Sequence, residues 1–187
     1  EYTADGIIPI LSDISKLCNK GSCVNKTLRA AVLFSGDSGF YSGAEKLKNA
    51  LEIFAEESEV DADVYVYPGR SSVSYLSSKA KVSYSDSKII SIHGRGTKEE
   101  KASAIIGAAM YNRKTFILLS GAEDACYVGN ILLENGLDNC KVVVGFNLSE
   151  KSERIRVLSP EECVRLSDKG SYILLIINDS AYCQVLS

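Results

Sequence analysis

The chain of 187 residues lacks tryptophan and has one histidine, one methionine and three prolines. A single histidine argues against a structural zinc site, because the six cysteines are scattered and only Cys18 and Cys23 lie close together. The longest apolar runs, such as residues 172–177, are too short to cross a bilayer. No charged and then apolar leader opens the sequence, so secretion is not expected. We therefore expect a cytoplasmic protein whose cysteines are mostly small buried hydrophobes.

Strong charge and several familiar motifs are also missing. The net charge is −3 and no basic run is present, which argues against nucleic-acid binding. There is no Gly-x-Gly-x-x-Gly after a strand, no phosphate loop, no His-Glu-x-x-His and no Gly-x-Ser-x-Gly. These absences argue against a dinucleotide oxidoreductase, a P-loop nucleotidase, a zinc protease and an α/β-hydrolase, respectively.

Strand and helix patterns alternate along the chain. Apolar or alternating runs predict strands at residues 29–34, 60–67, 88–92, 115–120, 141–144 and 172–177. Helical spacing predicts helices at residues 44–54, at 97–110 with Thr97 as N-cap, and at about 125–134, ending at Asn135-Gly136. The pattern predicts an α/β fold with a mostly parallel sheet covered on both faces. Pro68-Gly69 suggests a boundary between an N-terminal lobe, residues 1–67, and a C-terminal lobe, residues 68–187.

Small, glycine-rich turns follow three of the predicted strands, at residues 35–37, 69–72 and 120–121. Ligands of such sheets bind outside the carboxyl ends of the strands, so the turns are candidates for one shared cleft. Asp37 can accept hydrogen bonds from ligand hydroxyls or an ammonium group, or it can cap the following helix. Ser71 and Ser72 can likewise bind a ligand or merely close a turn.

The segment Ser-Ile-His-Gly-Arg-Gly, residues 91–96, also follows a strand. His93 at this glycine-flanked end is either structural or part of a cleft. Arg95 either faces solvent or pairs with a carboxylate of an anionic substrate, for which its planar donors are suited.

Four motifs occur in order: residues 32–43 (VLFSGDSGFYSG), 67–73 (YPGRSSV), 91–95 (SIHGR) and 145–149 (GFNLS), the last followed by Glu153-Arg154-Ile155. This set resembles the tetrapyrrole methylases of corrin synthesis, and within them the branch that methylates carbon 5 of cobalt-precorrin-7. The resemblance implies two α/β lobes that hold S-adenosylmethionine in the cleft between them. It implies methylation of a ring carbon of a cobalt-precorrin in cobalamin biosynthesis.

The resemblance also implies roles for individual residues. If the substrate is a corrinoid, Arg95 and Arg70 are candidates to grip its acetate and propionate side chains, although Arg70 departs from the family pattern. His93 is the candidate base for a ring proton, because imidazole exchanges protons readily near neutral pH, and Tyr41 is the alternative. The residues that match cofactor-binding positions are Ser35, Gly36, Asp37, Gly39, Phe40, Ser71, Ser72, Leu119, Ser120, Gly145, Phe146 and Asn147.

The chain departs from the family pattern at several points. Where this chain has Ser38 the family usually has proline, and where it has Arg70 the family usually has an aliphatic residue. Its opening strand and Gly-x-Gly-Pro-Gly loop precede anything in this sequence, so the N-terminal lobe is expected to be incomplete. A cofactor- or tetrapyrrole-binding module without turnover therefore stays open, as does a sister methylase acting on another corrinoid carbon, a ribosomal RNA ribose or the translation factor modified to diphthamide. The expected partners are the corrinoid substrate, a second copy in a homodimer and a decarboxylating methyltransferase, with no nucleic acid and no membrane.

Overall fold

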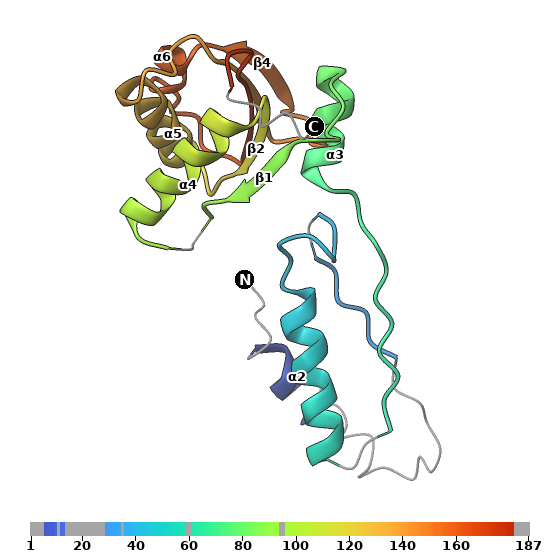
Figure 1. Ribbon diagram of the computed structural model, residues 1–187. Helices are drawn as coiled ribbons and strands as arrows, with labels where there is room; N and C mark the ends of the chain where they lie inside the picture. Colours follow the sequence, from blue (N-terminus) through green and yellow to red (C-terminus); the bar gives the residue numbers. More distant parts are fainter. Residues whose placement is uncertain are drawn as a thin grey trace. The chain divides into compact units, whose positions relative to one another are not determined.

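The computed structural model describes residues 6–10, 12–13, 29–34, 36–58, 61–93 and 96–181 (Figure 1). The chain divides into two compact units, Glu1–Ser71 and Ser72–Ser187. Pro68-Gly69, the turn expected at the boundary, lies in the extended segment that ends the first unit. No helix in the described ranges is long and apolar enough to cross a membrane.

The second unit is built on one five-stranded sheet with the strand order β1-β2-β5-β3-β4. Its strands are β1 (Lys88–Ser91), β2 (Lys114–Leu118), β3 (Lys141–Phe146), β4 (Arg154–Leu158) and β5 (Tyr172–Ile177). β1 and β2 are parallel, whereas β5 runs antiparallel to both β2 and β3, and β4 runs antiparallel to β3. The α/β class is confirmed, but the expectation of a mostly parallel sheet is wrong for this sheet. β5 is buried on both faces and so has the same continuous apolar sequence as a parallel strand.

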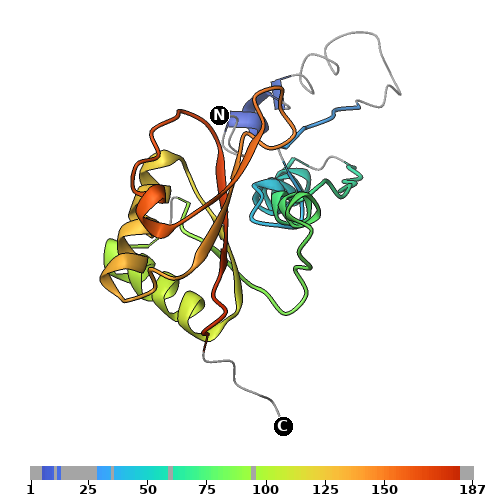
Figure 2. The same cartoon turned by 90° about the horizontal axis from the view of Figure 1, so that it is seen from above.

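Helices cover both faces of this sheet (Figures 1 and 2). One face carries α4 (Lys98–Tyr111), α5 (Ala122–Glu134) and α6 (Pro160–Cys163). Between these helices and the strands lies the main apolar core, which includes the buried side chains of Ile105, Val128, Ile117, Val144 and Leu174. The short α3 (Ser72–Ala80) packs against β5 on the other face and buries Val73 and Leu76.

Local capping chemistry explains where several helices begin and end. Thr97 caps α4 as predicted, since its hydroxyl accepts the Glu100 amide at 3.3 Å and the Glu100 carboxylate accepts the Thr97 amide at 2.8 Å. Asn135 is the C-cap of α5, and Gly136 follows with a positive φ of 69°. α6 was not predicted, although Ser159 forms the same kind of capping box with Glu162 and Pro160 occupies the first position of the helix.

The first unit contains the predicted helix α2 (Ala44–Glu57), which buries Ala44 and Leu47. Residues 6–10 and 12–13 are also helical. The strands predicted at residues 29–34 and 60–67 are wrong for the described residues, which form no ladder there. A pattern of apolar side chains favours extended backbone, but a strand forms only where its amides and carbonyls pair with a neighbour.

Candidate functional site

The predicted site residues of the second unit gather at one edge of its sheet. Because β5 is antiparallel to both β2 and β3, strands β1, β2 and β3 all run in the same direction. Their carboxyl ends therefore meet at one edge, where His93 follows β1, Leu119 and Ser120 follow β2, and Asn147 follows β3. The shared cleft expected for the turns at residues 35–37, 69–72 and 120–121 stays a prediction, because these turns are divided between the two units.

Asn147 fastens two loops at this edge. Its Oδ1 accepts the Ser171 amide at 2.8 Å, and its Nδ2 donates to the Ser152 hydroxyl at 3.0 Å. Its own amide donates to the Ser171 carbonyl at 3.0 Å. The residue has a left-handed φ of 43°, a conformation that asparagine tolerates better than most residues. The side chain and the backbone amide of Asn147 are thus both engaged inside the protein, and its carbonyl accepts the Glu150 amide at 3.1 Å.

The Phe146 ring packs against the residues around the start of β5. It is buried, meets the Tyr172 ring edge-on with centroids 5.0 Å apart, and lies 4.4 Å under the Arg154 guanidinium. Gly170 packs directly against it, since a Cβ on Gly170 would lie 2.5 Å from the ring and 2.4 Å from the Asn147 Oδ1. Only glycine permits this approach, so the position of Gly145-Phe146-Asn147 is fixed by packing.

The end of β2 lies beside these residues. Leu119 is buried, Ser120 is exposed, and the Ser120 amide donates to the Asp124 carboxylate at 2.7 Å. A Cβ on Gly121 would lie 3.9 Å from the Gly170 carbonyl oxygen. The loops after β2 and before β5 are therefore neighbours, and the loop before β5 also contacts Asn147.

Within the first unit, the predicted cofactor loop is a tight turn. Gly36 has a φ of +82°, and the Asp37 Oδ1 accepts the Gly39 amide at 2.8 Å. The Phe40 amide donates to the Asp37 carbonyl at 3.2 Å. The N-cap of α2 is Gly43, so Asp37 does not cap that helix, the alternative left open by the sequence. The other carboxylate oxygen of Asp37, Oδ2, accepts no hydrogen bond from the described residues.

The second predicted loop of this unit lies directly against the first. A Cβ on Gly69 would lie 2.0 Å from the Gly36 carbonyl oxygen and 3.2 Å from the Asp37 Cα, so this contact requires glycine. The Ser38 hydroxyl donates to the Tyr67 carbonyl at 2.7 Å. The serine that replaces the family's proline thus joins the two loops.

The remaining predicted residues divide between the units. Tyr41 is half-exposed, has a φ of 50°, and contacts the Phe40 ring edge-on at 5.0 Å. Arg70 is exposed and Ser71 ends the first unit, while Ser72 begins α3 in the second. The predictions for Ser35 and Arg95 lie outside the described residues.

The thiols of the second unit behave as small buried groups, as expected. Cys140 and Cys163 are buried, and loss of hydration raises the pKa of Cys140 to about 11 and that of Cys163 to about 12. Cys126 is half-buried, and its thiol donates to the Leu166 carbonyl at 3.0 Å. Cys18, Cys23 and Cys183 lie outside the described residues. In the described ranges no three metal-ligating side chains come together.

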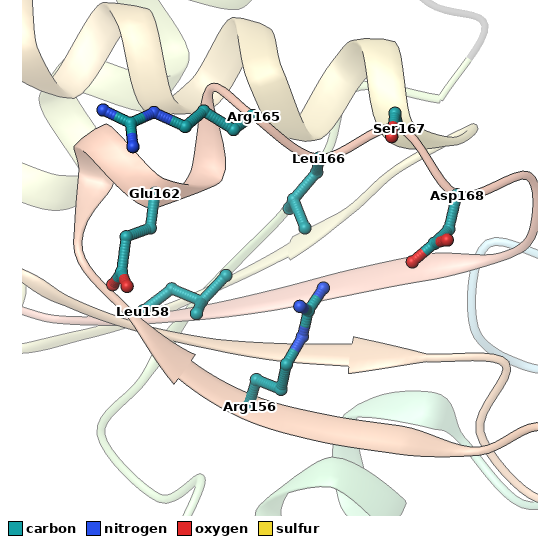
Figure 3. Close-up of a pocket in the computed structure, with 7 residues that line it drawn as sticks. All are labelled: Arg156, Leu158, Glu162, Arg165, Leu166, Ser167 and Asp168. Atoms are coloured by element: carbon teal, nitrogen blue, oxygen red, sulfur yellow. The ribbon is translucent and has the colours of Figure 1, made fainter.

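A pocket of about 350 Å³ lies between β4, α6 and the segment that follows α6 (Figure 3). Figure 3 shows Arg156 rising from β4 toward the segment that carries Leu166 and Asp168. Two of its charged groups already have partners, since Arg165 pairs with Glu161 at 2.7 Å and Asp168 with Arg154 at 2.8 Å. None of the lining residues is a predicted site residue: they are Arg156, Leu158, Glu162, Arg165, Leu166, Ser167 and Asp168. The sheet edge remains the candidate site.

Glu153 is a residue of this region to which the sequence assigned no role. It stands in the motif GFNLS…ERI, so the signal was present but its purpose was not. In the structure its Oε2 accepts the Ser149 amide at 2.7 Å, in the loop that follows Asn147. Ser149 has a left-handed φ of 68°, which costs about 1–3 kcal/mol for a residue other than glycine. The carboxylate helps to hold that conformation.

Comparisons with known proteins agree with this geometry. The family model of the Tetrapyrrole (Corrin/Porphyrin) Methylases matches residues 18–162. The chain is 30% identical over 155 residues to a probable cobalt-precorrin-7 C(5)-methyltransferase of Methanocaldococcus jannaschii. That match covers 82% of this chain and 66% of the relative, so the chain spans a little less than two thirds of the relative's length.

Solved structures share the fold at lower identity. The crystal structure of the methyltransferase CobJ matches with a TM-score of 0.60 and 18% identity, over 77% of this chain and 62% of that one. The cobalamin biosynthetic enzyme cobalt precorrin-4 methyltransferase, CbiF, matches with a TM-score of 0.54 and 16% identity, over 75% of this chain and 60% of that one. By its family model and its fold, the chain belongs to the tetrapyrrole methylases.

Proposed function

We propose that this protein is an S-adenosylmethionine-dependent methyltransferase that methylates carbon 5 of a cobalt-precorrin in cobalamin biosynthesis. Membership of the tetrapyrrole methylases supports the reaction class, and the relative from Methanocaldococcus jannaschii supports the substrate. The observation that carries the proposal is the meeting of the strand ends of β1, β2 and β3, which brings Ser120 and Asn147 to one edge. In the first unit, the close contact between the loops at Gly36 and Gly69, which requires glycine at position 69, supports the proposal independently.

The residues present fit the cofactor. Bound S-adenosylmethionine supplies a methyl group on a positively charged sulfonium, together with a ribose diol and an ammonium group. Asp37 offers a carboxylate oxygen for hydroxyl or ammonium donors, and the space where a Gly36 side chain would stand is open. In the second unit, the hydroxyl of the exposed Ser120 offers a further polar group, and the cofactor is expected to pack against residues 145–147. Ser71 and Ser72 complete the set as contacts for the methionine end.

Catalysis in this proposal depends mainly on positioning, because an electron-rich ring carbon is itself the nucleophile. Arg70 and Arg95 bind the carboxylates of the ring's acetate and propionate side chains through charge-assisted hydrogen bonds. The imidazole of His93, exposed just beyond β1, accepts the proton that leaves the ring after methylation. The phenol of Tyr41 is the alternative acceptor. Carbon 5 is assigned on the relative alone.

Two measurements test the proposal. Isothermal titration with S-adenosylhomocysteine is expected to show one site per chain, and absence of binding overturns the proposal. Incubation with cobalt-precorrin-7 and S-adenosylmethionine labelled on the methyl group is expected to move the label to the corrinoid. Binding without transfer identifies a module without turnover, and transfer only to another acceptor identifies a sister methylase.

A variant separates the role of His93 from that of binding. His93→Ala is expected to lower turnover about a hundredfold, as loss of a general base does, while titration with S-adenosylhomocysteine stays unchanged. If His93→Ala keeps full turnover with an unaltered pH profile, another group accepts the ring proton. The same measurement on Tyr41→Phe then tests the alternative acceptor.

We also propose that the protein works as a homodimer and alongside a decarboxylating methyltransferase, as the family resemblance implies. Light scattering at micromolar protein concentration tests the first point, and co-purification of the two native proteins tests the second. A monomer at every concentration contradicts the dimer without affecting the proposed reaction.

A further inference from the structure

The loop between β3 and β4, residues 147–153, has an unusual backbone that several bonds hold in place. Asn147 and Ser149 both have positive φ values, 43° and 68°. Within the loop the Glu150 amide donates to the Asn147 carbonyl at 3.1 Å, and the Glu153 amide donates to the Glu150 carbonyl at 3.1 Å. Backbone conformations of this kind persist only where the surroundings enforce them.

Glu153 ties this loop to α3. Its Oε2 accepts the Ser149 amide at 2.7 Å, while its Oε1 lies 3.0 Å from the Lys79 Nζ. The side chain of Tyr75, one helical turn before Lys79, also hydrogen-bonds the carboxylate, and the Lys79 ammonium lies 5.3 Å over the Tyr75 ring. Glu153 thus has partners on two elements that are far apart in sequence.

The carboxylate of Glu153 is partly shielded from solvent, and its contacts favour the ionised form. Its side chain is 19% exposed. The hydrogen bonds from Tyr75 and from the Ser149 amide, together with Lys79, lower the pKa of Glu153 from 4.5 to about 2. The same contact with Glu153 raises the pKa of Lys79. Both groups therefore remain charged throughout the neutral range.

The two elements joined by Glu153 each begin with a proposed cofactor contact. α3 begins at Ser72, and the loop begins at Asn147. We propose that Glu153 is a positioning residue: by tying the loop to α3 through Ser149, Tyr75 and Lys79, it sets the separation of Ser72 and Asn147 that the cofactor must span. This inference rests on the proposed function.

The test compares S-adenosylhomocysteine binding by the wild type and by Glu153→Gln. The amide keeps the size of the side chain but presents an NH₂ group to one of three donors. Affinity is expected to fall about tenfold, a magnitude ordinary for coupling through a packed contact. In turnover assays KM for S-adenosylmethionine is expected to rise by the same factor while kcat is unchanged. Lys79→Met, which removes only one partner, is expected to give a smaller loss of affinity.

Glu161→Gln is the matched control, because Glu161 also pairs with a basic side chain but is 69% exposed and lies in α6. Its affinity is expected to equal that of the wild type. Hydrogen exchange without ligand adds a second readout: amides of residues 147–153 are expected to exchange faster in Glu153→Gln, with β2 and β5 unchanged.

Different outcomes separate the two proposals. Wild-type affinity in Glu153→Gln, or unchanged exchange in the loop, overturns the positioning role and leaves the proposed function standing. Failure of the wild type itself to bind S-adenosylhomocysteine overturns both. An equal rise of exchange across all strands of the second unit shows a general loss of stability and also overturns the positioning role.

Discussion

The two units differ in how they hold their candidate binding residues. The second unit has a five-stranded sheet, helices on both faces and a continuous apolar core, and its strand ends are fixed by hydrogen bonds such as those of Asn147. Among the described residues of the first unit, the buried apolar side chains are Ile7, Ala44 and Leu47. Its loops are held instead by close backbone contact at Gly69. Stability is therefore concentrated in the second unit, and precise placement in the first depends on single contacts.

The largest difference is expected from one substitution made in each unit. Leu174 in β5 is fully buried, so Leu174→Ala removes packed methyl groups and is expected to lower the free energy of unfolding by about 2–5 kcal/mol. Leu33 is 94% exposed, and Leu33→Ala is expected to change it by less than about 0.5 kcal/mol. Urea denaturation followed by circular dichroism measures both. Equal losses contradict the contrast between the units.

A pair of glycines within the second unit sharpens the role of its sheet edge. Gly170→Ala places a methyl group 2.5 Å from the Phe146 ring and is expected to cost about 1–3 kcal/mol of unfolding free energy and to weaken S-adenosylhomocysteine binding. Gly107 in α4 has open space beside it, and Gly107→Ala is expected to stabilise by about 0.5–1 kcal/mol. The two changes should thus have opposite signs. If Gly170→Ala leaves the free energy of unfolding unchanged, the residues around Phe146 can rearrange to accommodate the methyl group.

The corresponding change in the first unit should separate binding from stability. Gly69→Ala puts a Cβ 2.0 Å from the Gly36 carbonyl oxygen, so the backbone of one loop must move. We expect about a tenfold weaker affinity for S-adenosylhomocysteine, or roughly 1.4 kcal/mol, with the main unfolding transition unchanged. Titration and denaturation of the same sample measure the two effects. Unchanged affinity removes these loops from the binding site.

The smallest effect is expected from pH, because the Glu153–Lys79 pair is partly exposed and screened. The pKa of Glu153 is about 2 in the folded protein against 4.5 normally, so its stabilisation is complete above about pH 4.5 and is lost as the pH falls toward 2. The difference in unfolding free energy between wild type and Glu153→Gln is expected to stay constant from about pH 5 to 9 and to shrink in acid. If the difference in unfolding free energy grows in acid instead, the contacts of Glu153 raise its pKa rather than lower it, and the prediction is wrong.

The predictions from the sequence were more successful for the second unit than for the first. Long apolar runs and caps such as Thr97 predicted most strands and helices of the second unit, because local pattern and tertiary packing agree there. The direction of β5 could not be predicted, since a strand buried on both faces has no pattern that encodes direction. β4 was missed because it lies at the edge of the sheet, where Arg154 and Arg156 interrupt the apolar run.

For the site, the sequence predicted that His93 and Ser120 stand at strand ends, and the parallel pairing of β1 and β2 brings those two ends to one edge. Asn147, named only through the family resemblance, follows the end of β3 at that same edge. The sequence could not predict that the Asn147 side chain bonds Ser171 and Ser152, because those partners are set by the fold rather than by local sequence. Nor could it reveal why Glu153 accompanies the motif, which depends on contact with a helix more than seventy residues earlier, at Lys79. The roles of these residues toward a ligand stay predictions.

The order of strands in the sheet has a consequence for synthesis of the protein. β5 is the last of the five strands in the sequence but lies between β2 and β3. While the ribosome is still adding residues before 172, those two strands have no neighbour on their facing edges and their apolar side chains are uncovered. The nascent second unit must therefore wait for its final strand before the sheet can close, and this is the interval in which a chaperone is of most use to it.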